Sequence, residues 1–204
     1  THLDALPLKS SNLKRRVGES MRACGMQEVQ SLTLSNKRDQ FEKVRWPNEG
    51  YVTEIANPIT LDHTLLRQYI LPSLLRLLAA NRHHELPQRV YELGEVIRDS
   101  KNFLRAAWAC AEVGSGFTSS KGIIQALLRD MGAIHDDVEF RATDVEDGPW
   151  ISGRGSHVFI RDEKIGEFGE IDPKVSGFFG IKSPIQAGEI DLEAIYRIIP
   201  DPIS

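Results

Sequence analysis

Two apolar stretches, RVYELGEVI (89–97) and FLRAAWACAEV (103–113), decide the fold class of this chain. Both are rich in β-branched, aromatic and small apolar residues, and the polar segment RDSKN (98–102) lies between them. Two strands joined by so short a turn pair antiparallel, because a parallel pair needs a much longer crossover connection. The sequence therefore predicts an antiparallel β-hairpin.

The rest of the chain predicts further strands and a few helices. Strands are expected at 28–34, 138–142 and 184–195, with a second hairpin over 157–171, whereas the polar segment 35–51 predicts a long connection. Helices are expected over 10–26, 72–83, 119–132 and 172–180, from their apolar spacing, their Ser, Asp or Pro starts and, in three of them, a Gly near the end. Strands and helices do not alternate regularly, so we expect an α+β fold with an antiparallel sheet flanked by helices.

Composition limits the classes of function. The chain has 204 residues, 41% of them hydrophobic, and a net charge of −4. A protein that binds nucleic acid mainly through phosphates is usually basic, so any such contact here is a local patch or belongs to another part of an assembly. Lone cysteines at positions 24 and 110 predict free thiols in a reducing cytoplasm. No apolar run is long enough to cross a bilayer, and Thr1 in place of an initiator Met suggests a fragment of a longer chain.

The polar cluster NRHHELPQR (81–89) is a candidate site of several kinds. His83 and His84 are adjacent, so their side chains diverge, and the remaining histidines are scattered along the sequence; we therefore predict no metal site. No glycine pattern marks a phosphate loop, and a thiolate at Cys110 would be disfavoured inside an apolar strand. Spacing alone thus identifies no active site, and the role of the two histidines stays open.

The helix expected over 10–26 carries one apolar stripe, formed by Leu13, Val17, Met21 and Cys24. The opposite face is charged. Two interpretations fit this pattern, since the stripe can rest on the core of the same chain or pack on a partner.

Several blocks, in order, resemble the β subunit of phenylalanyl-tRNA synthetase of the archaeal and eukaryotic-cytosolic type. They are LKRRVGESMRACGMQEVQSLTL, ANP, LLRQYILPSLLRLLAANRHHELPQR, VYELGEVI, SSKGIIQALLRDMG and GEFGEIDPKVSGFFGIKSPIQAGEIDL. The resemblance implies a class II synthetase-like domain over 10–198, after a linker (1–9) from an upstream domain and before a C-terminal tail (199–204). It also implies that the working active site, with ATP and Mg²⁺, lies on the α subunit, and that this domain holds no cofactor.

The same resemblance implies a vestigial nucleotide site at Arg98, Ser100 and Glu193. Class II enzymes place an arginine two positions before a glutamate in their second motif; Arg98 matches the arginine, but Ser100 stands where the glutamate belongs. Asp99 is one position off, which in a strand means the opposite face. Glu193 falls where the third motif has its ATP-binding arginine, and a carboxylate there would repel a triphosphate. We therefore expect no catalytic residue in this domain.

In that family, helices of α and β subunits meet in a bundle that builds an (αβ)₂ heterotetramer. Carried over, the stripe of Leu13, Val17, Met21 and Cys24 would meet the α subunit, with Arg82 and Arg89 as further interface residues. The segment 81–89 can equally be a solvated turn, or a contact to the tRNA of the full assembly. Two other functions stay open: an active ATP-dependent adenylating ligase with degenerate motifs, supported by Arg98, and a nucleic-acid binding module.

Overall fold

The computed structural model describes residues 2–199, with side chains from Ser11 onward. A seven-stranded sheet in the order β1-β4-β5-β9-β8-β7-β6 forms its centre, and a two-stranded ribbon pairs β2 with β3. The strands are β1 (Gln27–Glu28), β2 (Leu34–Ser35), β3 (Leu65–Leu66), β4 (Gln88–Arg98), β5 (Lys101–Ala111), β6 (Val138–Ala142), β7 (Trp150–Ile160), β8 (Glu163–Ile171) and β9 (Ile185–Asp191). All neighbours in the large sheet are antiparallel except β1 and β4.

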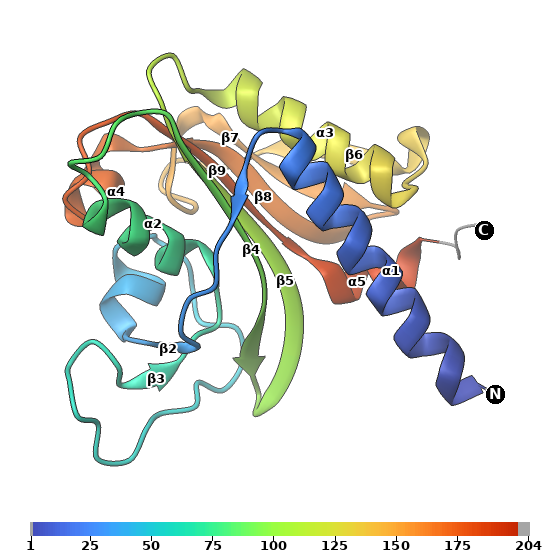
Figure 1. Ribbon diagram of the computed structural model, residues 1–204, viewed down its shortest axis with the longest axis horizontal. Helices are drawn as coiled ribbons and strands as arrows, with labels where there is room; N and C mark the ends of the chain where they lie inside the picture. The colour runs from blue at the N-terminus through green and yellow to red at the C-terminus, as the bar shows by residue number, and fades with distance from the viewer. Residues whose placement is uncertain (1, 200–204) are drawn as a thin grey trace.

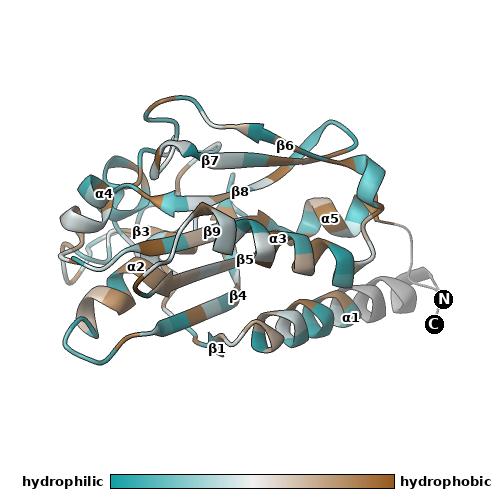
Figure 2. Ribbon diagram, turned by 90° about the horizontal axis from the view of Figure 1, so that it is seen from above, coloured by the Kyte–Doolittle hydropathy of each residue, from teal (hydrophilic) through white to brown (hydrophobic). Residues whose placement is uncertain are grey.

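Helices cover both faces of the sheet (Figures 1 and 2). They are α1 (His2–Ala23), η1 (Arg38–Glu42), α2 (Leu71–Ala80), α3 (Phe117–Met131), η2 (His135–Asp137), α4 (Pro173–Phe178) and α5 (Leu192–Ile198). One apolar core lies between the sheet and α1, α3 and α5; a second lies between the sheet and α2, η1 and α4. The predicted α+β architecture is therefore confirmed. Within the described residues, no helix is long and apolar enough to span a membrane.

The predicted central hairpin is β4 and β5, paired from Gln88↔Ala111 to Arg98↔Lys101. Its two-residue turn has positive φ at both Asp99 (51°) and Ser100 (61°), the backbone that suits the right-handed twist of a hairpin. Asp99 also accepts a hydrogen bond from the backbone N–H of Tyr51, at 2.6 Å. The turn chemistry of RDSKN thus suits the register of the β4–β5 hairpin.

Packing across the sheet depends on one glycine. Trp108 of β5 pairs with Gly188 of β9, and a Cβ atom on Gly188 would lie 2.2 Å from the Trp108 ring. The indole is fully buried and donates to Gln186 Oε1 at 2.8 Å. Gly188 therefore lets the largest core side chain lie flat on the neighbouring strand.

Several elements differ from the prediction. Helix α1 begins at His2, not at residue 10, because serine in mid-helix costs only about 0.5 kcal/mol relative to alanine and need not act as a cap. The strand expected at 28–34 shrinks to two separate dipeptides, since Ser31 binds the Glu92 carboxylate through both its N–H (3.1 Å) and its hydroxyl (2.6 Å) instead of joining a ladder.

Other differences are helices that the sequence analysis left out, among them the short η2. Residues 38–42 form a short π-helix inside the expected connection 35–51. The last strand ends at Asp191, whose carboxylate accepts the N–H of Ala194 at 3.0 Å and so caps α5. Of the expected tail 199–204, residues 200–204 lie outside the described part of the chain.

Candidate functional site

A polar cavity of about 280 Å³ opens on the α2 face of the sheet. Strands β4, β5, β8 and β9 form its floor, and the segment 46–49 with Tyr69 covers it. Side chains alternate along a strand, so Glu189 and Asp191 of β9 point into it while Ile190 enters the opposite core. Its lining residues are Trp46, Pro47, Glu49, Tyr69, Arg98, Arg105, Asp147, Lys164, Ile165, Gly166, Glu167, Glu189 and Asp191.

A buried ion pair occupies the floor of this cavity. Arg105 Nε donates to Glu189 Oε2 at 2.6 Å, and the Glu189 side chain is 1% exposed. The other carboxylate oxygen accepts the backbone N–H groups of Ile70 (2.8 Å) and Leu71 (2.6 Å), at the start of α2. A helix N-terminus beside an arginine is an anion-binding arrangement. Here the anion is the chain's own Glu189.

The pKa values of both arginines in the cavity are shifted. Burial alone lowers the pKa of Arg105, but the charge and hydrogen bond of Glu189 outweigh it and raise the pKa above its ordinary value. Burial, with the nearby Arg105, lowers the pKa of Arg98. Both effects follow from the water-poor setting, in which paired charges attract strongly and like charges repel strongly.

Arg98 is engaged by the protein itself. Its Nε and Nη2 atoms donate to the backbone carbonyl of Gln68 at 3.2 and 2.8 Å, and its guanidinium lies 4.9 Å from the centre of the Tyr69 ring. Burial raises the pKa of Tyr69 well above its usual range, and its hydroxyl donates to the Pro47 carbonyl at 2.6 Å. Arg98 thus forms part of the cavity wall. Two of its five N–H donors are bonded to the chain itself.

Glu167, at the other end of the cavity, is likewise bonded to groups of the chain itself. One of its oxygens accepts the indole N–H groups of Trp46 (3.2 Å) and Trp150 (2.8 Å). The other oxygen lies 2.9 Å from Lys164 Nζ. Each of the three cationic side chains of the cavity therefore has at least one partner within the chain.

The balance of charge in the cavity is acidic. Five carboxylates and three cationic side chains line it. A nucleoside triphosphate carries several negative charges, and repulsion between like charges is strong where water is scarce. The cavity lacks the excess of cations that a phosphate site needs, and its strongest anion position is filled.

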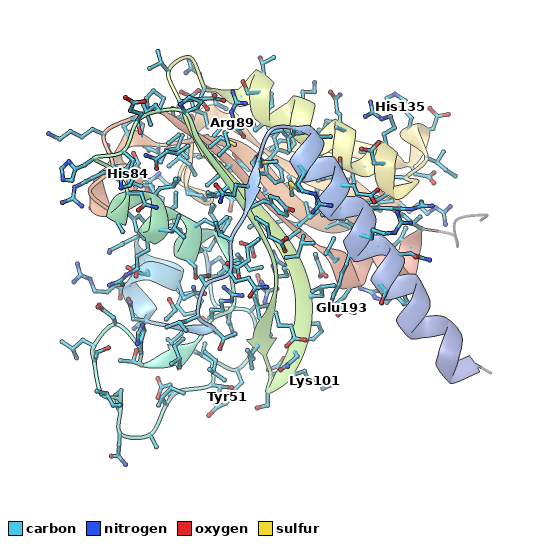
Figure 3. All side chains as sticks on the ribbon, in the orientation of Figure 1. Tyr51, His84, Arg89, Lys101, His135 and Glu193 are labelled. Atoms are coloured by element: carbon cyan, nitrogen blue, oxygen red, sulfur yellow. The ribbon has the colours of Figure 1, made fainter. Side chains whose placement is uncertain are left out.

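The structure separates the three residues predicted as a vestigial nucleotide site. Arg98 lines the cavity, but Ser100 lies in the exposed hairpin turn. Glu193, labelled in Figure 3, stands on α5 and accepts the backbone N–H of Leu104 at 3.1 Å. It is not one of the residues that line the cavity. The carboxylates whose charges act on Arg98 are Glu189 and Glu49, which the sequence analysis missed. A charged residue within an apolar strand, as at Arg105 and Glu189, is the signal that could have found this pair.

The predicted partner stripe on α1 needs a correction. Val17 and Met21 are fully buried and Leu13 is 9% exposed, all within the core that α1 shares with α3, α5 and the sheet. Cys24 is partly buried against the same core. The chain's own sheet covers this stripe, because an apolar face indicates burial without saying by what. Val17 and Met21 are therefore enclosed by the chain itself, and within the stripe Cys24 is the side chain left partly open to a partner.

The cluster 81–89 is an exposed link between α2 and β4. Arg82 donates to the Ala79 carbonyl at 2.9 Å and Arg89 pairs with Glu112 at 2.5 Å. The side chains of His83 and His84 are exposed, and that of His84 is labelled in Figure 3. Within the described residues, no group of three or more His, Cys, Asp or Glu could hold a metal ion.

Both thiols are free, as predicted. Cys110 is fully buried and Cys24 partly so. Burial raises the pKa of Cys110 to about 12, so the thiolate is scarce at neutral pH. Neither cysteine pairs with the other or with a base.

Comparison with known proteins identifies this arrangement. A pyrrolysyl tRNA synthetase of Desulfitobacterium hafniense has a similar fold, with a TM-score of 0.72 at 13% identity over 92% of this chain and 67% of its own. Phenylalanine–tRNA ligase beta subunits of Methanococcoides burtonii and Pyrococcus horikoshii are 37% and 39% identical over 85% of this chain. The chain spans about a third of the length of these relatives, 31% of each. The model of the phenylalanyl tRNA synthetase beta chain CLM domain matches residues 5–192, and the chain belongs to that family.

Proposed function

We propose that this chain is a non-catalytic, class II synthetase-like domain that scaffolds a phenylalanine–tRNA ligase. It serves tRNA aminoacylation in translation, in the cytoplasm, by assembling with a catalytic α subunit into an (αβ)₂ heterotetramer. ATP, Mg²⁺ and the chemical step belong to that partner, and tRNA is bound by the full assembly. Membership of the beta-chain family supports this proposal.

The observation that carries the proposal is the carboxylate of Glu189. It fills the position between Arg105 and the N-terminus of α2 where an external anion would bind. An enzyme that makes an aminoacyl adenylate must stabilise charge on phosphorus, which requires donors aimed at the substrate. In this cavity the chain's own carboxylate takes the strongest such position, so we assign the cavity a structural role.

The surface for the α subunit must then lie away from the buried stripe of α1. Ile59 and Leu61, on the loop that leads into β3, are 98% and 88% exposed. This loop projects from the body at the lower edge of Figure 1. Large apolar side chains in water are costly unless a partner covers them, and obligate interfaces are apolar. We place the contact with the α subunit on this loop.

The test is aminoacylation by the assembled complex. A β subunit that contains this chain is co-expressed with its α subunit, as wild type and with Arg98→Met or Lys164→Met in the cavity. We expect unchanged tRNA charging, because neither side chain meets ATP. A more than tenfold fall in kcat with an intact complex by size-exclusion chromatography would instead make the cavity catalytic.

A further inference from the structure

A second cavity, of about 440 Å³, lies at the other end of the sheet from the hairpin turn. The C-terminal half of α2, the link 81–88 and the loop after α4 border it. Its lining residues are Leu78, Arg82, His83, Leu86, Gln88, Ala111, Gly180, Ile181, Lys182 and Ser183. It shares no residue with the acidic cavity.

The inner wall of this second cavity is apolar. Leu78, Ala111 and Ile181 are 2–4% exposed, so they form a fixed floor. Leu86 is 40% exposed. The volume is ample for one large aliphatic or aromatic side chain, and an apolar pocket of this kind is where the anchor residue of an interface binds.

The border of the cavity carries three basic side chains and no acidic one. Arg82, His83 and Lys182 line it, and of the described lining residues none is Asp or Glu. Among the ion pairs of the described residues, none includes these three side chains. Arg82 uses one N–H group on the Ala79 carbonyl, which holds the guanidinium beside the end of α2. The border is therefore complementary to carboxylates.

The two segments that border the cavity are held by hydrogen bonds of their own. Gln88 Nε2 donates to the carbonyls of Asn81 (2.9 Å) and His84 (3.2 Å), which braces the link. On the other side, the N–H of Ile181 donates to the Ser176 carbonyl at 2.9 Å. A preformed cavity costs little ordering on binding, so even a short ligand can be recognised.

We propose that this cavity docks an acidic polypeptide segment that inserts one large apolar side chain between flanking carboxylates. The apolar floor takes the side chain, and Arg82 and Lys182 take the carboxylates. A nucleic acid fits less well, because bases are recognised by stacking on aromatic rings and the cavity has no Phe, Tyr or Trp among its lining residues. The proposal is independent of the role of the acidic cavity.

The test titrates the ¹⁵N-labelled chain with the blocked pentapeptide acetyl-Asp-Glu-Phe-Glu-Asp-amide and follows amide chemical shifts. We expect saturable shifts at Ala111, Ile181 and Ser183. Two matched peptides, one with Ala for Phe and one with Lys for each acid, separate the two halves of the recognition. Each should bind at least fivefold more weakly than the original acidic peptide.

Variants of the chain locate the site. Lys182→Glu and Leu86→Ser should each weaken binding of the acidic peptide by about fivefold or more. Lys101→Glu carries the same change of charge at the far end of the hairpin, well away from the link that contains His84 in Figure 3, and should alter the Kd less than twofold. Unchanged ¹⁵N spectra away from the substitutions show that each variant is folded.

Three results would overturn the proposal. The first is no saturable shift with the acidic peptide, and the second is equal binding by the lysine peptide. The third is a larger shift of the same amides with single-stranded dodecauridylate, which would make the cavity a nucleic-acid site.

Discussion

Glu189 is the residue that sets the character of the acidic cavity, and its partners can be tested one by one. Both carboxylate oxygens of Glu189 are bonded, and its side chain is 1% exposed. The substitution Glu189→Gln therefore leaves Arg105 buried without an anion. Breaking a buried pair from one side costs about 3–5 kcal/mol. The double variant Glu189→Gln/Arg105→Met should recover part of that loss in urea unfolding. Purely additive losses would show that the two side chains do not depend on each other.

Val17 tests the corrected assignment of α1. Because it is fully buried in the chain's own core, Val17→Asp should lower the free energy of unfolding by about 4 kcal/mol or more. Lys14→Asp, on the exposed side of the same helix, should cost less than about 1 kcal/mol. A Val17→Asp chain as stable as wild type would return the stripe to a partner surface.

Asp39 gives the chain one component of its pH dependence. Burial alone raises the pKa of Asp39, but hydrogen bonds from Lys43 and Arg76 outweigh it and hold the pKa below its ordinary value. A lowered folded pKa means that this stabilisation is fully present above about pH 4. It is lost as the pH falls through the folded value.

Asp39→Asn should therefore cost about 2 kcal/mol at pH 7. The difference from wild type should shrink in unfolding curves recorded near pH 2.5. Asp62→Asn is the matched control, because Asp62 is the exposed second partner of Arg76. A gap between Asp39→Asn and wild type that stays constant with pH would contradict this origin.

The loop before β3 is the element that tests the assembly surface. Ile59→Ser/Leu61→Ser should leave the unfolding free energy of this chain within about 0.5 kcal/mol, since both side chains lie in water. The same change should weaken association with the α subunit at least tenfold in a pull-down titration. Val113→Ser, at another exposed apolar position, is the control. Equal affinity of the double variant and wild type would move the contact elsewhere.

Local chemistry explains which elements the sequence could predict. The β4–β5 hairpin, α2, α3 and α4 are encoded by turn residues, prolines and caps within a few positions, such as Gly132 in the left-handed conformation (φ 92°) after α3. The π-helix at 38–42 offers no apolar period, and its support from Arg76 comes from a distant segment. Periodicity finds an apolar face, but only tertiary structure says what covers it.

The candidate site was less predictable than the fold for the same reason. Arg98 was found from the sequence, whereas the pair of Arg105 and Glu189 joins residues 84 positions apart through the β5–β9 pairing. The helix N-terminus that completes it comes from a third segment. Glu193 was misplaced into the cavity because the strand ends at Asp191 and the chain turns into α5.

For the whole molecule, the most direct measurement is isothermal calorimetry of this chain with ATP and Mg²⁺. An anion site already filled by Glu189, in a cavity with more carboxylates than cations, should give no saturable heat up to millimolar ATP. Saturable binding with a Kd in the micromolar range would contradict the scaffold role and make the cavity a working nucleotide site.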